Sequence, residues 1–258
     1  MAIASASLAY RRNALMSATK VTTKPPSEEV LKARDDFIDF CTVMGKPPAK
    51  HMREWHNELC TGKDSECLLG IGGANTAILA PRGSAKSTVL GLFAAWMIGR
   101  HAAAKKMLRI LYIAYMVDIS RAKSATIKGI LTSPKYREIF PMVRLSKIKR
   151  SDEYWSIDYE FAGIDTAGEE AFTIACGGLK GAITSKRSQL VLIDDPIKSA
   201  ASINNPDIRR EMEQTWSNVI APTMFQGARA ICLGTRFHFD DIHATLFVPK
   251  NNWKQIVQ

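Results

Sequence analysis

The stretch TAILAPRGSAKSTVL, residues 76–90, decides the fold of this 258-residue chain. It predicts an apolar strand over 76–80, a tight loop, and a helix that begins at Lys86-Ser87-Thr88. A phosphate-binding loop (P-loop) has this layout, because backbone N–H groups and a helix N-terminus then point at phosphate oxygens. Lys86 can reach terminal phosphates, and the Ser87 hydroxyl can hold Mg²⁺. The open alternative is an ordinary strand-to-helix turn with a surface lysine.

The loop departs from the usual pattern G-x-x-x-x-G-K-S/T, because alanine stands at both glycine positions, Ala80 and Ala85. We expect Gly83 and the small Ser84 to restore part of the backbone freedom. The predicted nucleotide-binding residues of the loop are Pro81, Arg82, Gly83, Ser84, Ala85, Lys86, Ser87 and Thr88.

A second apolar strand, over 189–193, ends in the paired carboxylates of Asp194 and Asp195. In a nucleoside triphosphatase (NTPase), the first carboxylate holds Mg²⁺ through water, and the second orients and deprotonates the attacking water. Taken alone, the pattern is more typical of a strand that ends in an acidic turn before Pro196. A P-loop upstream within one domain-sized stretch makes the joint pattern typical of a P-loop NTPase.

A third strand, over 228–235, ends in Gly234-Thr235-Arg236. Carboxyl ends of strands line the ligand crevice of an α/β sheet. Thr235 is therefore predicted to sense the γ-phosphate and pass the change on to the neighbouring segment.

The remaining pattern predicts alternating helices and strands. Ser27 is expected to cap the first helix, and Asp118 the helix after the second strand. Helices are predicted at 28–43, 51–60, 86–98, 118–131, 134–140, 206–219 and after 239. Strands are predicted at 76–80, 108–114, 154–161, 170–175, 189–194, 228–235 and 253–258.

These elements predict an α/β P-loop NTPase with a central, mostly parallel β-sheet flanked by helices. Residues 1–47 would form an N-terminal arm and helix, a small lid-like extension, and residues 48–258 the ATPase core. The last strand reads as unfinished, so we expect a longer protein. Within the short helix at 51–60, Trp55 and His56 are candidates for an aromatic and polar patch beside adenine, and Trp55 is equally well explained as core.

The net charge of +10 favours an acidic partner, most simply nucleic acid, although solubility alone would also explain it. The candidate DNA contacts are Lys147, Lys149, Arg150, Lys186 and Arg187, which would serve equally as a solvated face. The five cysteines show no C-x-x-C pair, which is typical of reduced thiols in a cytosolic protein. No stretch is long and apolar enough to predict a membrane span.

Three blocks, residues 81–88, 190–196 and 233–238, together resemble the ATPase domain of the large terminase subunit of tailed bacteriophages. That family is the motor that packages genomic DNA into a procapsid, and the resemblance covers about residues 48–258. It implies that Lys86 contacts the β- and γ-phosphates, and that Arg82 matches the arginine of the family's non-standard first motif. It also implies the roles of four more residues: Ser87 and Asp194 as Mg²⁺ ligands, Asp195 as the catalytic carboxylate, and Thr235 in the coupling motif.

The resemblance further implies ATP and Mg²⁺ as cofactors, and double-stranded DNA, the portal protein, the procapsid and the small terminase subunit as partners. Members act as a ring, expected to hold five subunits, in the cytoplasm of the bacterial host. Residues 51–59 resemble the adenine-recognition segment, with His56 where glutamine is usual, and Asp195 stands where glutamate is common. A nuclease domain would follow residue 258, so we expect no DNA cleavage from this chain. Such rings are also expected to use an arginine that one subunit donates to its neighbour's ATP, and the sequence does not single it out. Arg82, acting in cis, is the first residue to test, with Arg209, Arg210 and Arg236 after it.

Two other functions remain open from the sequence. One is a helicase-like ATPase stimulated by nucleic acid, although only one motor lobe fits the chain. The other is a nucleotide-binding scaffold without turnover, which Ala80, Ala85 and Asp195 keep possible.

Overall fold

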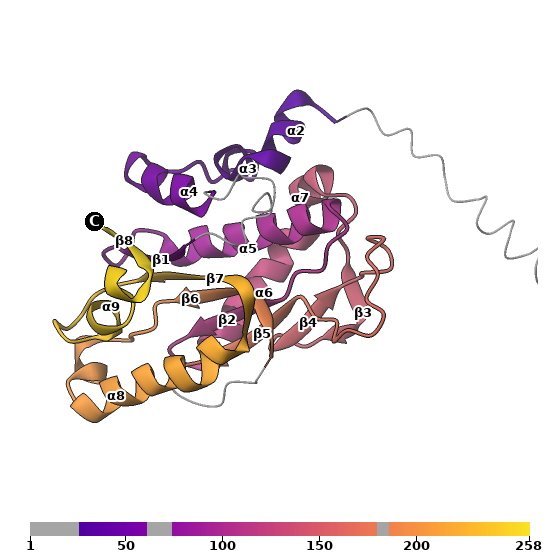
Figure 1. The fold of residues 1–258 in the computed structure, drawn as a ribbon. Helices are drawn as coiled ribbons and strands as arrows, with labels where there is room; N and C mark the ends of the chain where they lie inside the picture. The colour runs from indigo at the N-terminus through magenta and orange to yellow at the C-terminus, as the bar shows by residue number, and fades with distance from the viewer. Residues whose placement is uncertain (1–25, 61–73, 180–185) are drawn as a thin grey trace, which may run out of the picture.

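The computed structural model describes residues 26–60, 74–179 and 186–258, which form a central β-sheet with helices on both faces (Figure 1). The sheet has eight strands in the order β3-β4-β5-β2-β6-β7-β1-β8. From β5 to β8 neighbouring strands are parallel, whereas β3 and β4 form an antiparallel edge. The strands are β1 (Asn75–Leu79), β2 (Ile110–Ala114), β3 (Leu145–Arg150), β4 (Tyr154–Ile157), β5 (Ile174–Gly178), β6 (Ser188–Asp194), β7 (Met224–Gly234) and β8 (Trp253–Val257). The predicted α/β fold with a mostly parallel sheet is confirmed.

Two hydrophobic cores lie on opposite faces of the sheet, because alternate strand residues point to opposite faces. In β6, Leu190 and Leu192 belong to the core under α2–α7, whereas Val191 and Ile193 belong to the core under α8 and α9. All four side chains are fully buried, which explains the uninterrupted apolar run that the sequence shows. The helices are α2 (Glu28–Asp35), α3 (Phe37–Val43), α4 (Arg53–Leu59), α5 (Lys86–Ala103), α6 (Val117–Thr132), α7 (Pro134–Ile139), α8 (Pro206–Thr215) and α9 (Ile242–Thr245).

The predicted single helix at 28–43 is wrong, because the chain breaks at Asp36 into α2 and α3. The Asp36 backbone is extended (φ −120°, ψ 130°), and its carboxylate accepts hydrogen bonds from the N–H groups of Ile38 and Asp39 at 2.7 and 3.0 Å. The break turns Phe37 into the core, where it stacks on His56 at 4.8 Å between ring centres. Ser27 caps α2 as predicted. The arm at 1–25 lies outside the described residues.

Three further boundaries differ from the prediction. Helix α6 begins after Met116, so Asp118 is not its cap and instead forms an ion pair with Arg121 at 2.8 Å within the first turn. Residues 145–150, which precede the predicted strand at 154–161, are themselves strand β3 at the sheet edge. After α8 the chain continues as a π-helical segment, Trp216–Ile220.

Within the described residues, no helix combines the length and the apolar character that crossing a membrane would need.

We predict that Gly99→Ala destabilises the protein by about 1–3 kcal/mol, because its new methyl group would overpack the core. The added Cβ would lie 2.3 Å from Phe140 Cδ2, a contact that forces the ring to move. Gly91→Ala, in the same helix, is the matched control, since its Cβ would lie 3.8 Å from Ile127 Cγ1. There we expect unchanged stability or a gain of up to about 1 kcal/mol from helix propensity. Urea unfolding of both variants checks this, and equal stabilities would contradict it.

Candidate functional site

The sheet order brings the three predicted motifs to one edge of the sheet. Strand β7 lies between β1 and β6 and is parallel to both, with Leu79 beside Gly234 and Asp194 beside Leu233. The P-loop after β1, Thr235 after β7 and the carboxylates at the end of β6 therefore meet at the carboxyl ends of the strands, where α/β sheets bind ligands.

The P-loop keeps its turn although both motif glycines are alanine. Gly83 and Ala85 adopt left-handed backbone angles, φ 83° and φ 56°. For alanine this conformation costs about 1 kcal/mol, so Ala85 marks a strained turn of the kind found at ligand sites. Ala85 also occupies the N-cap of α5 and offers no side-chain hydrogen bond. The first N–H groups of α5 are thus left uncapped by a side chain, as in anion-binding helix ends.

Lys86 is 4% exposed and its ammonium is held by the ends of two strands. It donates hydrogen bonds to the carbonyls of Ala80 (3.1 Å) and Pro81 (2.9 Å) and to the Thr235 hydroxyl (3.0 Å). Thr235 in turn donates to the Ala80 carbonyl at 3.1 Å. The same ammonium lies 3.7 Å from Asp195 Oδ1. Lys86 therefore joins the P-loop, the end of β7 and the end of β6.

Asp194 is buried and receives two hydrogen bonds. Ser87 Oγ donates to Oδ1 at 2.8 Å, and the Tyr112 hydroxyl donates to Oδ2 at 3.0 Å. Burial raises the pKa of Asp194, and these two bonds lower it in part. Sequence reasoning missed Tyr112. The available signal was a lone hydroxyl in the apolar strand β2, since a buried tyrosine usually finds a hydrogen-bond partner.

Asp195 has an unusual backbone conformation for a residue other than glycine, with φ 41°. Its N–H donates to the Leu233 carbonyl at 2.9 Å, which fixes the turn. Its side chain is 43% exposed. Within the described part of the chain, neither carboxylate oxygen accepts a hydrogen bond. Oδ1 is buried and paired with Lys86, which leaves Oδ2 for a ligand or water.

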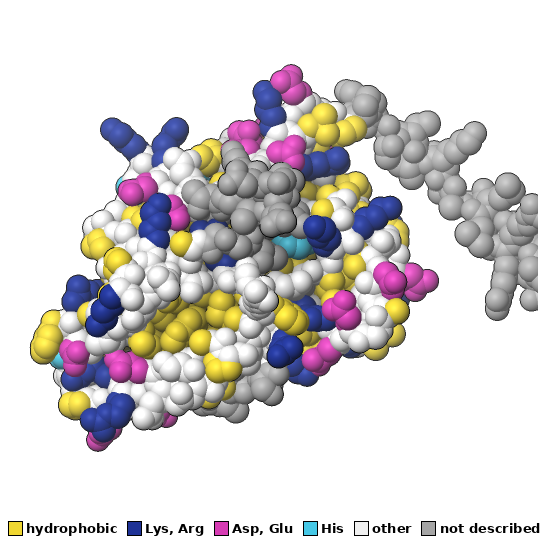
Figure 2. All heavy atoms as spheres, in the orientation of Figure 1, with side chains coloured by type: hydrophobic (Ala, Val, Ile, Leu, Met, Phe, Trp, Pro, Cys, Tyr) yellow, Lys and Arg dark blue, Asp and Glu magenta, His cyan; other side chains and the backbone are white. Residues whose placement is uncertain are grey.

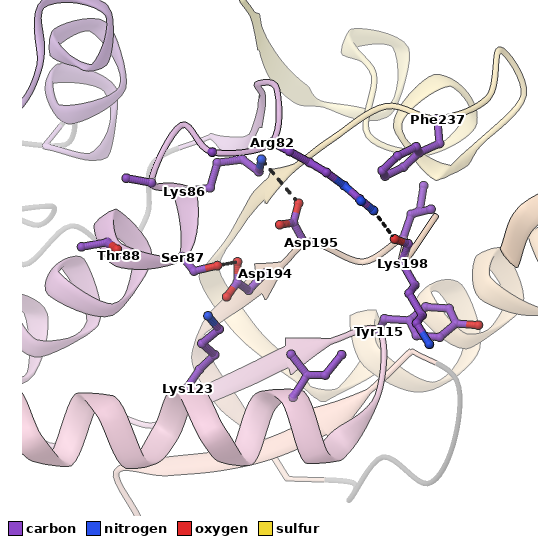
Figure 3. A pocket seen from close by; sticks show the side chains of 14 residues that line it. Arg82, Lys86, Ser87, Thr88, Tyr115, Lys123, Asp194, Asp195, Lys198 and Phe237 are labelled. Atoms are coloured by element: carbon purple, nitrogen blue, oxygen red, sulfur yellow. Dashed lines mark hydrogen bonds and ion pairs between the residues drawn. The ribbon is translucent and has the colours of Figure 1, made fainter. Parts of the chain in front are cut away.

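Arg82 points away from the loop and contacts the segments that follow β6 and β7 (Figure 3). Its guanidinium donates to the Lys198 carbonyl and lies 5.0 Å from the centre of the Phe237 ring. In this conformation Arg82 links the two carboxyl-end loops.

A cavity of about 530 Å³ lies among these side chains, a volume typical of small-molecule sites. Six of the eight predicted nucleotide-binding residues of the loop line this cavity, and Pro81 and Ser84 do not. Arg209, Arg210 and Arg236 do not line it. Its lining residues are Arg82, Gly83, Ala85, Lys86, Ser87, Thr88, Tyr115, Ile119, Lys123, Asp194, Asp195, Ile197, Lys198 and Phe237.

Trp55 and His56 do not line the cavity, so the structure does not support their predicted contact with adenine. Both are buried in the core, with Trp55 0% and His56 1% exposed. His56 Nδ1 lies 2.8 Å from the Met52 carbonyl, and its ring stacks on Phe37. Burial lowers the pKa of His56, which keeps the ring neutral at pH 7. The alternative that Trp55 is core fits the structure.

Gly234 closes β7 directly before Thr235 and packs against α9. An added Cβ there would lie 2.7 Å from His243 Cε1 and 3.3 Å from Pro196 Cδ. Burial lowers the pKa of His243 to about 4, so its imidazole is neutral at pH 7. The backbone of the strand end that carries Thr235 thus packs directly against the His243 ring of α9.

The predicted DNA contacts lie at the other end of the sheet. Lys147, Lys149 and Arg150 line a groove of about 790 Å³ beside β3. Lys186 lies close by, since Lys149 and Lys186 both approach the Tyr154 ring, at 5.6 and 5.3 Å from its centre. Lys186 is also paired with Glu170, whose pKa this hydrogen bond lowers. Arg187 lies instead over the Phe225 ring at 5.7 Å.

No protein-family model matches the chain, and no curated protein matches it significantly. Among solved structures, the large terminase ATPase domain of Thermus phage P74-26 is 17% identical, with a TM-score of 0.43, and the match covers 82% of this chain and 70% of that one. The large terminase of a thermophilic bacteriophage in complex with ATP-γ-S is 11% identical, with a TM-score of 0.45 and coverage of 90% and 44%. The HK97 bacteriophage large terminase is 14% identical, with a TM-score of 0.43 and coverage of 83% and 39%. The chain spans less than half the length of the latter two proteins.

We predict that Tyr112→Phe shifts divalent-metal binding to higher pH. Loss of the hydroxyl removes one of the hydrogen bonds that lower the pKa of Asp194, so the pKa rises further. The carboxylate then becomes ionised, and able to bind a metal, only at higher pH. Calorimetric titration with Mg²⁺ and nucleotide across pH checks this. Tyr159→Phe, whose hydroxyl donates to the Phe172 carbonyl at 2.6 Å far from the cavity, is the control, and matching profiles for both variants would contradict the role of Tyr112.

Proposed function

We propose that this chain is the ATP-hydrolysing motor domain of a viral DNA-packaging terminase. One observation supports ATP hydrolysis above all others. The Lys86 ammonium, the Ser87 hydroxyl and the carboxylates of Asp194 and Asp195 face one cavity at the carboxyl ends of β1 and β6. A phosphoryl-transfer site needs this set of groups: a cation for the phosphates, oxygen ligands for Mg²⁺, and a base or orienting group for water.

The residues present fit a Mg²⁺–nucleotide complex. Ser87 and Asp194 supply the oxygen ligands that Mg²⁺ prefers, and Tyr112 fixes the orientation of the Asp194 carboxylate. Mg²⁺, when bound, neutralises charge on the phosphate oxygens. The proposed task of the P-loop is to bind the phosphates with its N–H groups and with Lys86, which would exchange its present carbonyl partners for phosphate oxygens.

Asp195 is the proposed catalytic carboxylate. Its carboxylate faces the cavity 3.7 Å from Lys86, so a water on the far side of a terminal phosphate can be oriented and deprotonated there. Thr235 is the proposed coupling residue, because its hydroxyl contacts the same ammonium that would bind the γ-phosphate. A change at the phosphate would then alter the hydrogen bond at the end of β7.

The packaging assignment rests on the resemblance of the three motif blocks to large terminases. On that basis we propose that the chain acts in the host cytoplasm, in a ring of five copies docked on the portal of a procapsid, with the small terminase subunit.

The groove beside β3 is the proposed DNA contact. Figure 2 shows basic and acidic side chains interspersed on one face of the molecule, whereas the groove is lined by six cations and, among the described residues, no carboxylate. Its cations are Lys128, Arg137, Arg144, Lys147, Lys149 and Arg150.

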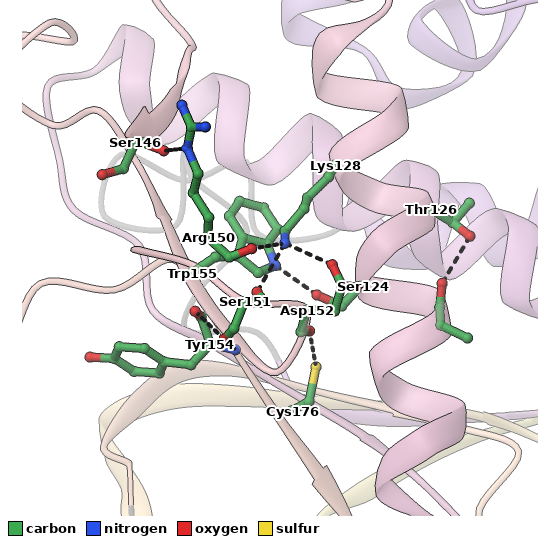
Figure 4. A network of polar contacts seen from close by, with 11 residues as sticks. Ser124, Thr126, Lys128, Ser146, Arg150, Ser151, Asp152, Tyr154, Trp155 and Cys176 are labelled. Atoms are coloured by element: carbon green, nitrogen blue, oxygen red, sulfur yellow. Dashed lines mark hydrogen bonds and ion pairs between the residues drawn. The ribbon is translucent and has the colours of Figure 1, made fainter. Parts of the chain in front are cut away.

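The groove has a fixed β3–β4 turn beside it and, among its described lining residues, no exposed aromatic ring. These two features favour a duplex backbone over unstacked bases. Lys128 donates to the carbonyls of Arg150 and Ser151 and pairs with Asp152 at 2.8 Å, which pins the β3–β4 turn (Figure 4). Trp155 is fully buried and donates to Ser124, so its ring offers no stacking platform. Contacts to phosphate then carry the binding, without sequence preference.

We predict that Asp195→Asn lowers ATP turnover by about 10²-fold or more while ATP binding persists. Asparagine is chosen because it tolerates the left-handed backbone at this position. Phosphate release and nucleotide affinity, measured across protein concentrations, check this, with Lys86→Ala expected to lose both. Retained turnover in Asp195→Asn would refute its assignment, and binding without turnover in the unmodified protein would favour the scaffold.

We predict that neutralising Arg137 and Lys147 flattens the salt dependence of duplex binding. Both side chains are exposed and, within the described residues, make no hydrogen bond or ion pair. The slope of log K against log salt should fall by about 0.9 for each phosphate that is no longer neutralised. Fluorescence anisotropy with Arg137→Gln/Lys147→Gln checks this, against the surface control Arg53→Gln/Lys250→Gln. Identical slopes for the two double variants would place DNA elsewhere.

A further inference from the structure

We propose that Lys123, on α6, is a second cationic contact for the terminal phosphate of the nucleotide. The inference rests on the proposed function and adds a residue that the P-loop pattern does not contain. Lys123 lines the cavity from the wall opposite the loop, one helical turn after Ile119, which lines the same cavity. In Figure 3 its ammonium points toward Ser87 and Asp194.

The two cations of the loop, Lys86 and Arg82, already have bonding partners, whereas the Lys123 ammonium is not bonded within the described residues. Lys86 already donates to two carbonyls and the Thr235 hydroxyl, and Arg82 is held by the Lys198 carbonyl and the Phe237 ring. Within the described residues, no hydrogen bond or ion pair engages the Lys123 ammonium. Its donors are therefore available to an anion that enters the cavity without breaking an existing contact.

The position of Lys123 is fixed by its helix rather than by a loop. Helix α6 packs through Ile127 and Leu131 into the core that also holds α5, and the Lys123 side chain is half-buried. Lys198, by contrast, lies on the exposed segment after β6, and Figure 3 shows its ammonium near Tyr115, away from Ser87. Of the two lysines, Lys123 is the one placed to meet the phosphates.

A second, smaller cavity shares this lysine. It has a volume of about 250 Å³, lies between α5 and α6, and is lined in part by Ser87, Thr88 and Lys123. Lys123 therefore stands at the boundary between the two cavities, beside the residues that would hold the metal. Among the described residues, Asp194 has no cation within ion-pairing distance, so an anionic ligand does not have to compete with a formed salt bridge.

The contact is tested by binding of ATP-γ-S and ADP to Lys123→Gln, with Mg²⁺ and with EDTA. Removing a charge-assisted bond to the terminal phosphate should weaken ATP-γ-S by about 10-fold or more while ADP changes less than about 2-fold. Lys123→Arg should restore most of the affinity. Lys198→Gln removes one positive charge from the same cavity, so it measures the general electrostatic effect and should change both affinities little.

Three outcomes would overturn the inference. They are unchanged affinity in Lys123→Gln, equal weakening for both nucleotides, and a weakening seen only with Mg²⁺, which would mean that Lys123 acts through the metal ligand Asp194. Lys86→Ala in the same assay separates the two proposals. If that variant loses binding and Lys123→Gln does not, only the role of Lys123 fails, whereas absence of binding in the unmodified protein refutes the nucleotide site itself.

Discussion

The site depends on one buried ammonium. Lys86 bonds the carbonyl at the end of β1, the carbonyl after it and the hydroxyl at the end of β7, and its charge faces Asp195 at the end of β6. A buried lysine is tolerated only when its donors are satisfied. These bonds therefore hold the P-loop in shape before any phosphate arrives, and a bound phosphate would take over the same donors. The P-loop, Thr235 and Asp195 are thus connected through the Lys86 ammonium.

The sheet can bring these groups together at one edge because helices cover both of its faces. The helices on either side bury alternate residues of each strand, so the inner strands have no solvated face and their polar residues are concentrated at the ends. Tyr112 and Arg229 are exceptions inside strands. The Tyr112 hydroxyl is bonded to Asp194, and the fully buried Arg229 guanidinium donates to the carbonyls of Ala74 and Glu58. The charges of the candidate site thus lie at the carboxyl edge of the sheet, with a separate basic groove at β3.

Much of the fold could be predicted from local sequence. The P-loop and the run that ends in Asp194 and Asp195 follow from apolar strands that end directly before charged groups. The break at Asp36 could not be predicted in this way. It depends on the Asp36 carboxylate, which caps α3, and on Phe37, which turns into a core built by distant residues. Trp55 and His56 suited a ligand surface by type, but packing on α3 and α5 buried them. Tyr112 needed the register between β2 and β6, which sequence alone does not supply.

Gly234 has no side chain, and this affects how movement at the end of β7 is passed to α9. At most strand ends, side chains lie between the backbone and the next layer. These side chains can change rotamer, so they absorb small displacements of the backbone. Here the strand touches the His243 ring directly, and the space is too small even for a methyl group. The ring is neutral, buried and, within the described residues, without a hydrogen-bond partner, so no polar tether resists its sliding. A shift of the backbone next to Thr235 would therefore press on the His243 ring of α9 directly, because Gly234 has no side chain that could rotate and absorb it.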